Sequence, residues 1–146
     1  MPRTVQGILS VIGRVMLCTI FFMAAVGNKI PHFNAVAEIM GKVGIPAPQV
    51  MLVGAIVFLI AGSLSVILGY RSRIGASLLL VFLILASYYF HAFWNLTEPQ
   101  AQQEQMIQFM KNLGLMGAMV LIIANGTGPM SLSDVHSRGL SRSESQ

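Results

Sequence analysis

Two long stretches of the chain contain no Asp, Glu, Lys or Arg. The first covers the twenty-eight residues 43–70, and the second covers the twenty-four residues 74–97. A helix needs about 20 mostly apolar residues to cross the hydrocarbon core of a bilayer, so each stretch is long enough to span it. Helices of small soluble domains show a polar face at every turn, which these stretches lack. The pattern therefore predicts two membrane-spanning helices.

Two further apolar stretches flank this pair, and each carries one basic residue, Arg14 or Lys111. The first stretch resembles a secretory signal, but signal peptides have 7–15 uninterrupted apolar residues and Arg14 interrupts this one. We therefore expect an all-α integral membrane four-helix bundle over residues 1–124. Its spans are predicted at about residues 5–27, 50–69, 74–93 and 106–124.

The basic residues outside the spans predict the orientation of the bundle. Five arginines fall on the side of the two termini, whereas Lys29 and Lys42 fall on the other side. Because positively charged loops stay inside, both termini are expected in the cytoplasm. Residues 125–146 contain six serines and little hydrophobicity, which predicts a disordered cytoplasmic tail. The five arginines are Arg3, Arg71, Arg73, Arg138 and Arg142.

The first outward loop, residues 28–49, contains apolar residues at helical spacing. Phe33, Val36, Ala37 and Met40 occupy positions i, i+3, i+4 and i+7. This spacing predicts a short interfacial helix at the outer rim of the bundle, with an irregular loop as the alternative.

Small residues recur at intervals of three and four in two of the spans. Span two has Gly62, Ser65 and Gly69, and span four has Gly114 and Ala118. Helices in lipid pack closely at small residues, so both stripes predict helix contacts. The contacts could lie within one chain or between protomers of a homo-oligomer.

Several polar residues are expected in one layer near the outer ends of the spans. Lys111 shares a helix face with Gly114 and Ala118, so we expect it to point into the bundle; the alternative is a side chain that snorkels to the headgroups. A basic, aromatic-lined pocket in this layer would suit a carbonyl or anionic ligand such as a quinone head group. Its candidate residues are Lys29, His32, Tyr88, His91 and Lys111.

Arg14 lies deep in span one, and no acidic residue in a span is available to pair with it. An ionisable residue in a span is costly and marks a functional hypothesis. Arg14 is expected either to bond hydroxyls and carbonyls within the bundle or to reach the cytoplasmic lipid phosphates. The candidate polar residues within the spans are Arg14, Ser63, Ser65 and Asn112. At the depth of Arg14, span two provides Ser63 and Ser65, and span three provides Ser77.

Composition excludes several classes of function. Hydrophobic residues make up 55% of the chain and charged residues 10%, which fits a membrane protein. The net charge of +4 comes from scattered residues, so we expect no nucleic-acid partner. The single cysteine, Cys18, excludes an internal disulfide and is expected to be an inert apolar thiol. The sequence contains no cluster of metal ligands, no glycine-rich phosphate loop and no carboxylate relay for transport.

Several short motifs follow one another in a fixed order over residues 13–123. They are Gly13-Arg14, Gly27-Asn28-Lys29-Ile30, Gly44-Ile45-Pro46-Ala47-Pro48, Gly62, Leu68-Gly69-Tyr70-Arg71-Ser72-Arg73, His91-Ala92-Phe93-Trp94 and the run from Gln105 through Lys111 to Gly114. Their order and spacing resemble those of the DoxX family of small four-helix membrane proteins.

The resemblance implies a bacterial-type inner-membrane protein. The family is named for a subunit associated with an archaeal quinone-linked oxidase, and related subunits take part in thiosulfate:quinone oxidoreduction. We therefore expect an accessory subunit of a quinone-linked redox assembly, with a redox protein as partner. The alternatives are a self-sufficient quinone-reactive oxidoreductase and a lipid-binding, stress-related or transport protein. Many members place a glutamate early in the second span, where this chain has Val53, Gly54 and Ala55. Its absence argues against a redox or proton role for Arg14.

Overall fold

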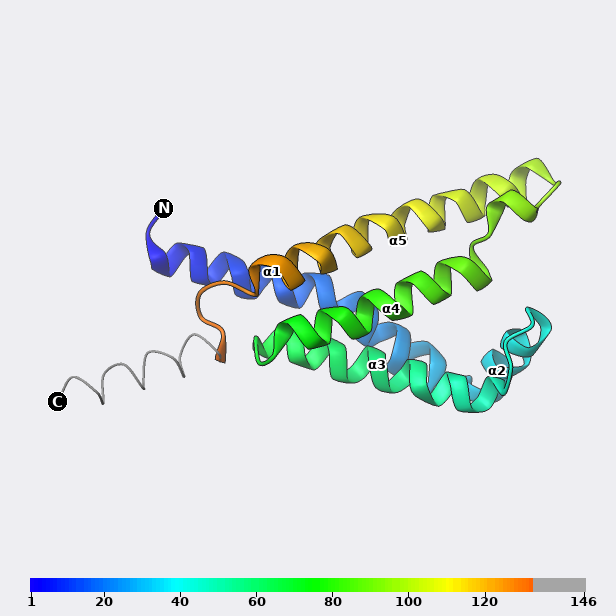
Figure 1. Cartoon of the computed structure of the whole chain (residues 1–146), viewed down its shortest axis with the longest axis horizontal. Helices are drawn as coiled ribbons and strands as arrows, with labels where there is room; N and C mark the ends of the chain where they lie inside the picture. The colour runs from blue at the N-terminus through cyan, green and yellow to red at the C-terminus, as the bar shows by residue number, and fades with distance from the viewer. Residues whose placement is uncertain (133–146) are drawn as a thin grey trace.

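The computed structural model describes residues 1–132 of the chain, and the described part is built from helices. Figure 1 shows the elongated bundle, with the N-terminus and the end of α5 at one end and α2 at the other. The elements are α1 (Arg3–Met23), the π-helical η1 (Ala24–Lys29), α2 (Phe33–Lys42), α3 (Pro48–Leu68), α4 (Ser72–Phe90), the 3-10 turn η2 (Phe93–Asn95) and α5 (Pro99–Asn125).

The four expected spans are confirmed as helices long and apolar enough to cross a membrane. The fourth helix begins at Pro99, seven residues before the predicted start of the span. Proline is favoured at the first position of a helix, and the Glu98 carboxylate accepts hydrogen bonds from the backbone N–H groups of Gln100 and Ala101. This cap starts the helix in a glutamine-rich segment. Because that segment is polar, the apolar pattern alone predicts a later start of the span.

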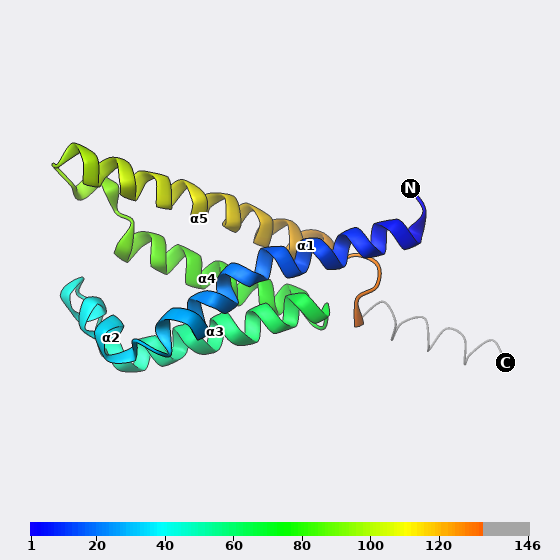
Figure 2. The same ribbon diagram turned by 180° about the vertical axis from the view of Figure 1, so that it is seen from behind.

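The helices pack in the order α1, α3, α4, α5. Helix α3 contacts α1, α2 and α4, whereas α5 packs mainly against α4. In Figures 1 and 2, α1 runs obliquely across the other helices from the N-terminal end toward α2. The main core lies between α1, α3 and α4, and α5 contributes its single buried residue, Met119.

Helices α3 and α4 approach each other closely at two glycines. A Cβ atom on Gly62 would lie 2.8 Å from Leu79 Cγ and 2.9 Å from the Gly75 carbonyl oxygen. A Cβ atom on Gly75 would lie 2.6 Å from Ser65 Oγ. The predicted contact at the small stripe of span two is therefore confirmed, and its partner is Gly75.

The helix expected in the first outward loop is confirmed as α2. Ala37 and Met40 are buried and pack with Leu52 of α3, as the apolar spacing predicts. Its position at the membrane interface stays a prediction.

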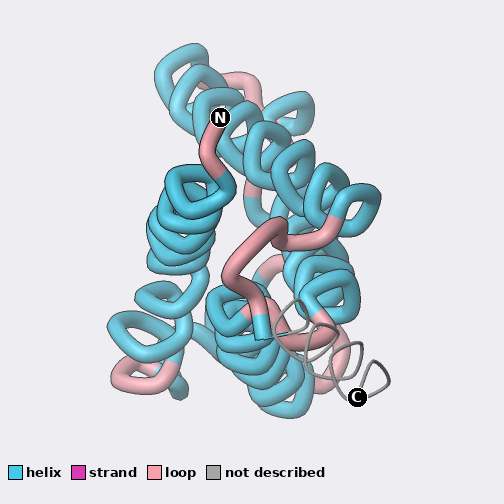
Figure 3. Tube along the Cα trace, turned by 90° about the vertical axis from the view of Figure 1, so that its left-hand side faces the viewer, coloured by secondary structure: helices cyan, strands magenta, loops and turns pink. Residues whose placement is uncertain are grey.

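The chain does not leave the bundle directly after α5. Residues 126–131, here called the C-terminal segment, fold back across the end of the bundle that carries the N-terminus (Figure 3). Thr127 and Ser131 are buried, and the Ser10 hydroxyl of α1 donates to the Thr127 carbonyl. The tail predicted to be disordered lies outside the described residues from position 133 onward.

Candidate functional site

The structure does not bring the five residues of the predicted outer layer into one pocket. Lys29 lies deeper than expected, because its ammonium sits 5.3 Å from the centre of the Phe82 ring of α4. Phe82 precedes His91 by nine residues, which is about 13 Å along a helix. The π-helical turn η1 ends at Lys29, and α1 is oblique, so counting residues along a straight span misplaced this side chain. Lys29 makes a cation–π contact instead of joining the layer.

His32 and Tyr88 are both exposed, and each contacts near neighbours in sequence. His32 Nδ1 lies 3.1 Å from the Asn28 carbonyl oxygen. The Tyr88 ring packs edge-on against Tyr89. The paired Tyr88 and Tyr89 rings are typical of an aromatic belt at the membrane interface, where such amphipathic rings are enriched.

His91 belongs to a polar seam between α4 and α5. Its Nδ1 lies 2.8 Å from Gln105 Oε1, and one turn deeper the Asn112 amide donates to the buried Ser87 hydroxyl at 3.0 Å. Hydrogen bonds of this kind hold neighbouring helices together in membranes. Two of the candidate residues, His91 and Asn112, therefore join α5 to α4.

The seam leads to a measurable prediction. Asn112→Ala should leave the Ser87 hydroxyl buried without its donor and lower the free energy of unfolding by about 1 kcal/mol. A double-mutant cycle with Ser87→Ala in detergent micelles should give a coupling energy of about 0.6 kcal/mol. Gln108→Ala, an exposed amide on the same helix, is the matched control and should show no coupling to Ser87→Ala. A zero coupling for Asn112 would show that the seam does not stabilise the bundle.

Lys111 and Gly114 are exposed, so the expectation that they face the interior of this bundle is wrong. Helix α5 turns Leu115, Met119 and Ile122 toward the core instead. A Cβ atom on Gly114 or Gly117 would meet nothing within 4 Å. We call the uncovered surface the open face of α5; its residues are Met110, Gly114, Gly117, Leu121 and Ala124, and Lys111 lies at its margin.

Arg14 is bonded within the bundle, as one of the two alternatives predicted. It is 4% exposed, and its partners are backbone carbonyls: Nε donates to Ser10 and Nη2 donates to Met130, each at 3.2 Å. Nη1 has no hydrogen-bond partner among the described residues. Arg14 therefore joins the C-terminal segment to α1, and its Nη1 is left without an acceptor among the described residues.

The three serines expected at the depth of Arg14 do not accept its hydrogen bonds. The Ser65 hydroxyl donates to the carbonyls of Tyr70 and Arg71 and holds the α3–α4 turn. The Ser77 hydroxyl donates to the Arg73 carbonyl of its own helix. Ser63 is fully buried in α3, and its hydroxyl has no partner among the described residues.

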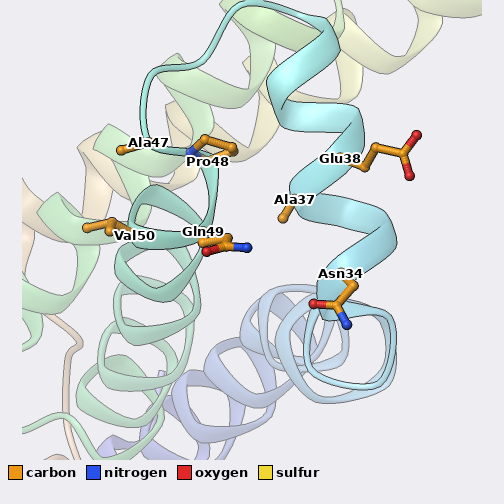
Figure 4. Close-up of a pocket in the computed structure, with 7 residues that line it drawn as sticks. All are labelled: Asn34, Ala37, Glu38, Ala47, Pro48, Gln49 and Val50. Atoms are coloured by element: carbon orange, nitrogen blue, oxygen red, sulfur yellow. The ribbon is translucent and has the colours of Figure 1, made fainter.

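A pocket of about 610 Å³ lies at the opposite end of the molecule, between α2 and the start of α3. Figure 4 shows Ala37 and Gln49 facing one another across this gap, while the Glu38 carboxylate points away from α3. Glu38 forms an ion pair with Lys42 at 2.7 Å. None of the predicted outer-layer residues lines this pocket, which is bordered by Asn34, Ala37, Glu38, Ala47, Pro48, Gln49 and Val50.

The Met130 carbonyl, which accepts a hydrogen bond from Arg14, could not be identified as its partner from the sequence. Gly126, Gly128 and Pro129 indicate a turn after α5, but a backbone carbonyl has no sequence signature. Metal ligands do not gather either: within residues 1–132, no three His, Cys, Asp or Glu side chains lie together. Cys18 is fully buried in the main core, among apolar side chains.

Comparison with known proteins gives the family. The DoxX family model matches residues 9–92, which is more than half of the chain. Inner membrane protein YphA of Escherichia coli (strain K12) is 27% identical over 125 residues, covering 86% of this chain and 88% of the relative. Inner membrane protein YqjF of the same strain is 27% identical over 117 residues, covering 80% and 84%. No solved structure matches the chain. With four membrane-spanning helices and inner-membrane relatives, the protein is a multi-pass inner-membrane protein and belongs to the DoxX family.

Proposed function

We propose that the protein is an accessory subunit of a quinone-linked redox assembly in the inner membrane. The observation that carries this proposal is the open face of α5. This helix buries one residue, Met119, whereas α3 buries five. A helix attached to its own bundle on one side has its other side available for a partner.

The chemistry of the open face favours a protein partner. Gly114 and Gly117 leave space at the helix surface, and small residues let the backbone of a second helix approach closely. Lys111 adds a positive charge at the margin of this face, and a partner helix with a carboxylate at the same depth would complement it. The quinone-linked character of the assembly rests on the similarity to the DoxX family.

The alternative of direct quinone binding has less support in the geometry. Lys29 contacts Phe82, His91 bonds Gln105, and Lys111 is exposed, so these groups do not converge on one ligand. In the proposed assembly, the partner carries the electron-transfer groups.

Replacing both glycines of the open face tests the proposal. Gly114→Leu/Gly117→Leu should leave the isolated bundle folded, because the new side chains meet open space. It should reduce recovery of the redox partner at least tenfold, since overpacking a contact costs about 1–3 kcal/mol and 1.4 kcal/mol is a factor of ten. The measurement is affinity purification of the full chain from its host membrane in mild detergent, followed by mass spectrometry and assay of quinone reduction.

A matched control is Gly13→Leu/Gly54→Leu, which adds the same bulk at two other glycines with open surroundings. It should retain the partner. If the wild-type chain purifies with lipid alone, the accessory-subunit proposal is wrong. If a second copy of the chain is recovered instead, the open face is a homo-oligomer interface.

A further inference from the structure

The four described arginines and the three described carboxylates lie at opposite ends of the bundle, and Lys42 lies at the carboxylate end, where it pairs with Glu38. The end that carries the N-terminus holds Arg3, Arg14 and the α3–α4 turn with its two arginines. The three described carboxylates, Glu38, Glu98 and Glu104, lie in or next to α2 and the start of α5, at the other end. The arginine-rich end therefore attracts anions over a wide area, which by itself specifies no site.

A pocket of about 480 Å³ concentrates this charge at one place. Its walls are residues 71–74, at the turn and the first turn of α4, and residues 125–128 with Ser131, from the end of α5 and the C-terminal segment. Arg71 and Arg73 are both exposed at its border. Thr127 and Ser72 lie on opposite walls and are joined by their hydroxyls at 3.4 Å.

The pocket also contains the N-terminal turn of a long helix. Arg71 is the N-cap residue of α4, and no side chain caps the helix there. The first N–H groups of a helix and its dipole favour an anion at this position. A helix N-terminus between two arginines therefore lies on one wall of the pocket.

Arg14 supplies an independent indication from inside the bundle. Its Nη1, which has no hydrogen-bond partner among the described residues, lies beside Ser131, a residue of the pocket wall, although Arg14 itself does not line the pocket. An atom placed at the Cβ position of Gly69 would be 2.3 Å from Nη1 and 2.4 Å from Ser131 Cβ, so the two flank the same point. A buried guanidinium nitrogen without an acceptor is costly, and an anion in or beside the pocket would lower that cost.

We propose that this pocket binds a phosphate group, with the two exposed arginines and the N-terminus of α4 as donors and Arg14 as the buried charge behind them. The phosphate could belong to the headgroup of an anionic phospholipid or to inorganic phosphate. The positive-inside rule predicts that this end of the bundle faces the cytoplasm, where the headgroups of the inner leaflet lie at the same level. The site is independent of the open face of α5 and of any redox partner.

Ligand-dependent unfolding of the purified full chain in uncharged detergent tests the proposal. The buried Cys18 thiol can report unfolding, because a thiol-reactive dye reaches it only when the bundle opens. Three probes are titrated separately: dioctanoyl phosphatidylglycerol, inorganic phosphate, and dioctanoylglycerol, which lacks the phosphate. We expect a saturable rise of the unfolding temperature with at least one of the two phosphates and none with dioctanoylglycerol. A response to the lipid alone identifies a headgroup site, and a response to both phosphates identifies a site that also fills from solution.

The matched variants distinguish a pocket from general attraction. Arg71→Gln/Arg73→Gln should weaken phosphate binding at least tenfold, whereas Arg3→Gln removes a charge at the same end but outside the pocket and should change it less than twofold. Arg3, Arg71 and Arg73 are also replaced singly by glutamine. Equal weakening by the three single substitutions would show delocalised attraction and overturn the proposal. The absence of a saturable response to either phosphate would overturn it as well.

Discussion

Gly62→Leu should be the most destabilising single change among those discussed. Its Cβ atom alone would lie 2.8 Å from Leu79 Cγ and 2.9 Å from the Gly75 carbonyl oxygen, and a backbone atom cannot move without separating the helices. Overpacking of this kind costs about 3 kcal/mol. We expect a large drop in unfolding temperature in detergent micelles, with loss of the folded state at the temperature where the wild type is stable.

The control for this change is Gly54→Leu, on the same helix. A Cβ atom there meets nothing within 4 Å, so the substitution should lower the unfolding temperature little. Gly75→Leu should be as harmful as Gly62→Leu. The double variant should lose less free energy of unfolding than the sum of the two single losses, because both substitutions act on one contact. Equal stability of the Gly54 and Gly62 variants would contradict the close approach of α3 and α4.

Arg14→Met should release the C-terminal segment from the bundle. The substitution removes the donors to the Ser10 and Met130 carbonyls, and hydrogen bonds to charged groups contribute about 1.5–3 kcal/mol each. With Cys18 replaced by alanine, a cysteine at the buried position 131 reports the change. Its rate of reaction with a soluble maleimide should rise at least tenfold in the Arg14→Met background.

Two control variants show whether the change is specific to Arg14 and to the buried position. Leu132→Cys, at an exposed position next to the reporter, should react fast in both backgrounds. Arg3→Met should leave the rate at position 131 close to that of the wild type. An unchanged rate after Arg14→Met would mean that other contacts hold the segment.

The sequence predicted the features that depend on one helix at a time. The length of the apolar stretches predicted the spans, and the spacing of Phe33, Val36 and Ala37 predicted α2. The glycine stripe of span two predicted a contact, but its partner Gly75 could be found only from the packing of α4.

The candidate site was harder to predict because it depends on how the helices are rotated and tilted. Position along a span gives the approximate depth of a side chain but not the direction in which it points. Lys111 shares a face with Ala118, yet α5 packs mainly against α4 and leaves Lys111 exposed. The tilt of α1 and its π-helical end carried Lys29 to Phe82. Arg14 is held by backbone carbonyls, which any sequence provides.

Cysteine accessibility tests most directly the arrangement on which both proposals depend, an antiparallel bundle of four spans with both ends of the described chain in the cytoplasm. Single cysteines at positions 2, 34, 102 and 132 of a Cys18→Ala chain are exposed to a membrane-impermeant maleimide in spheroplasts. Positions 34 and 102 should react at once, and positions 2 and 132 only after the membrane is disrupted. Reaction of positions 2 and 132 from opposite sides of the membrane would contradict the account.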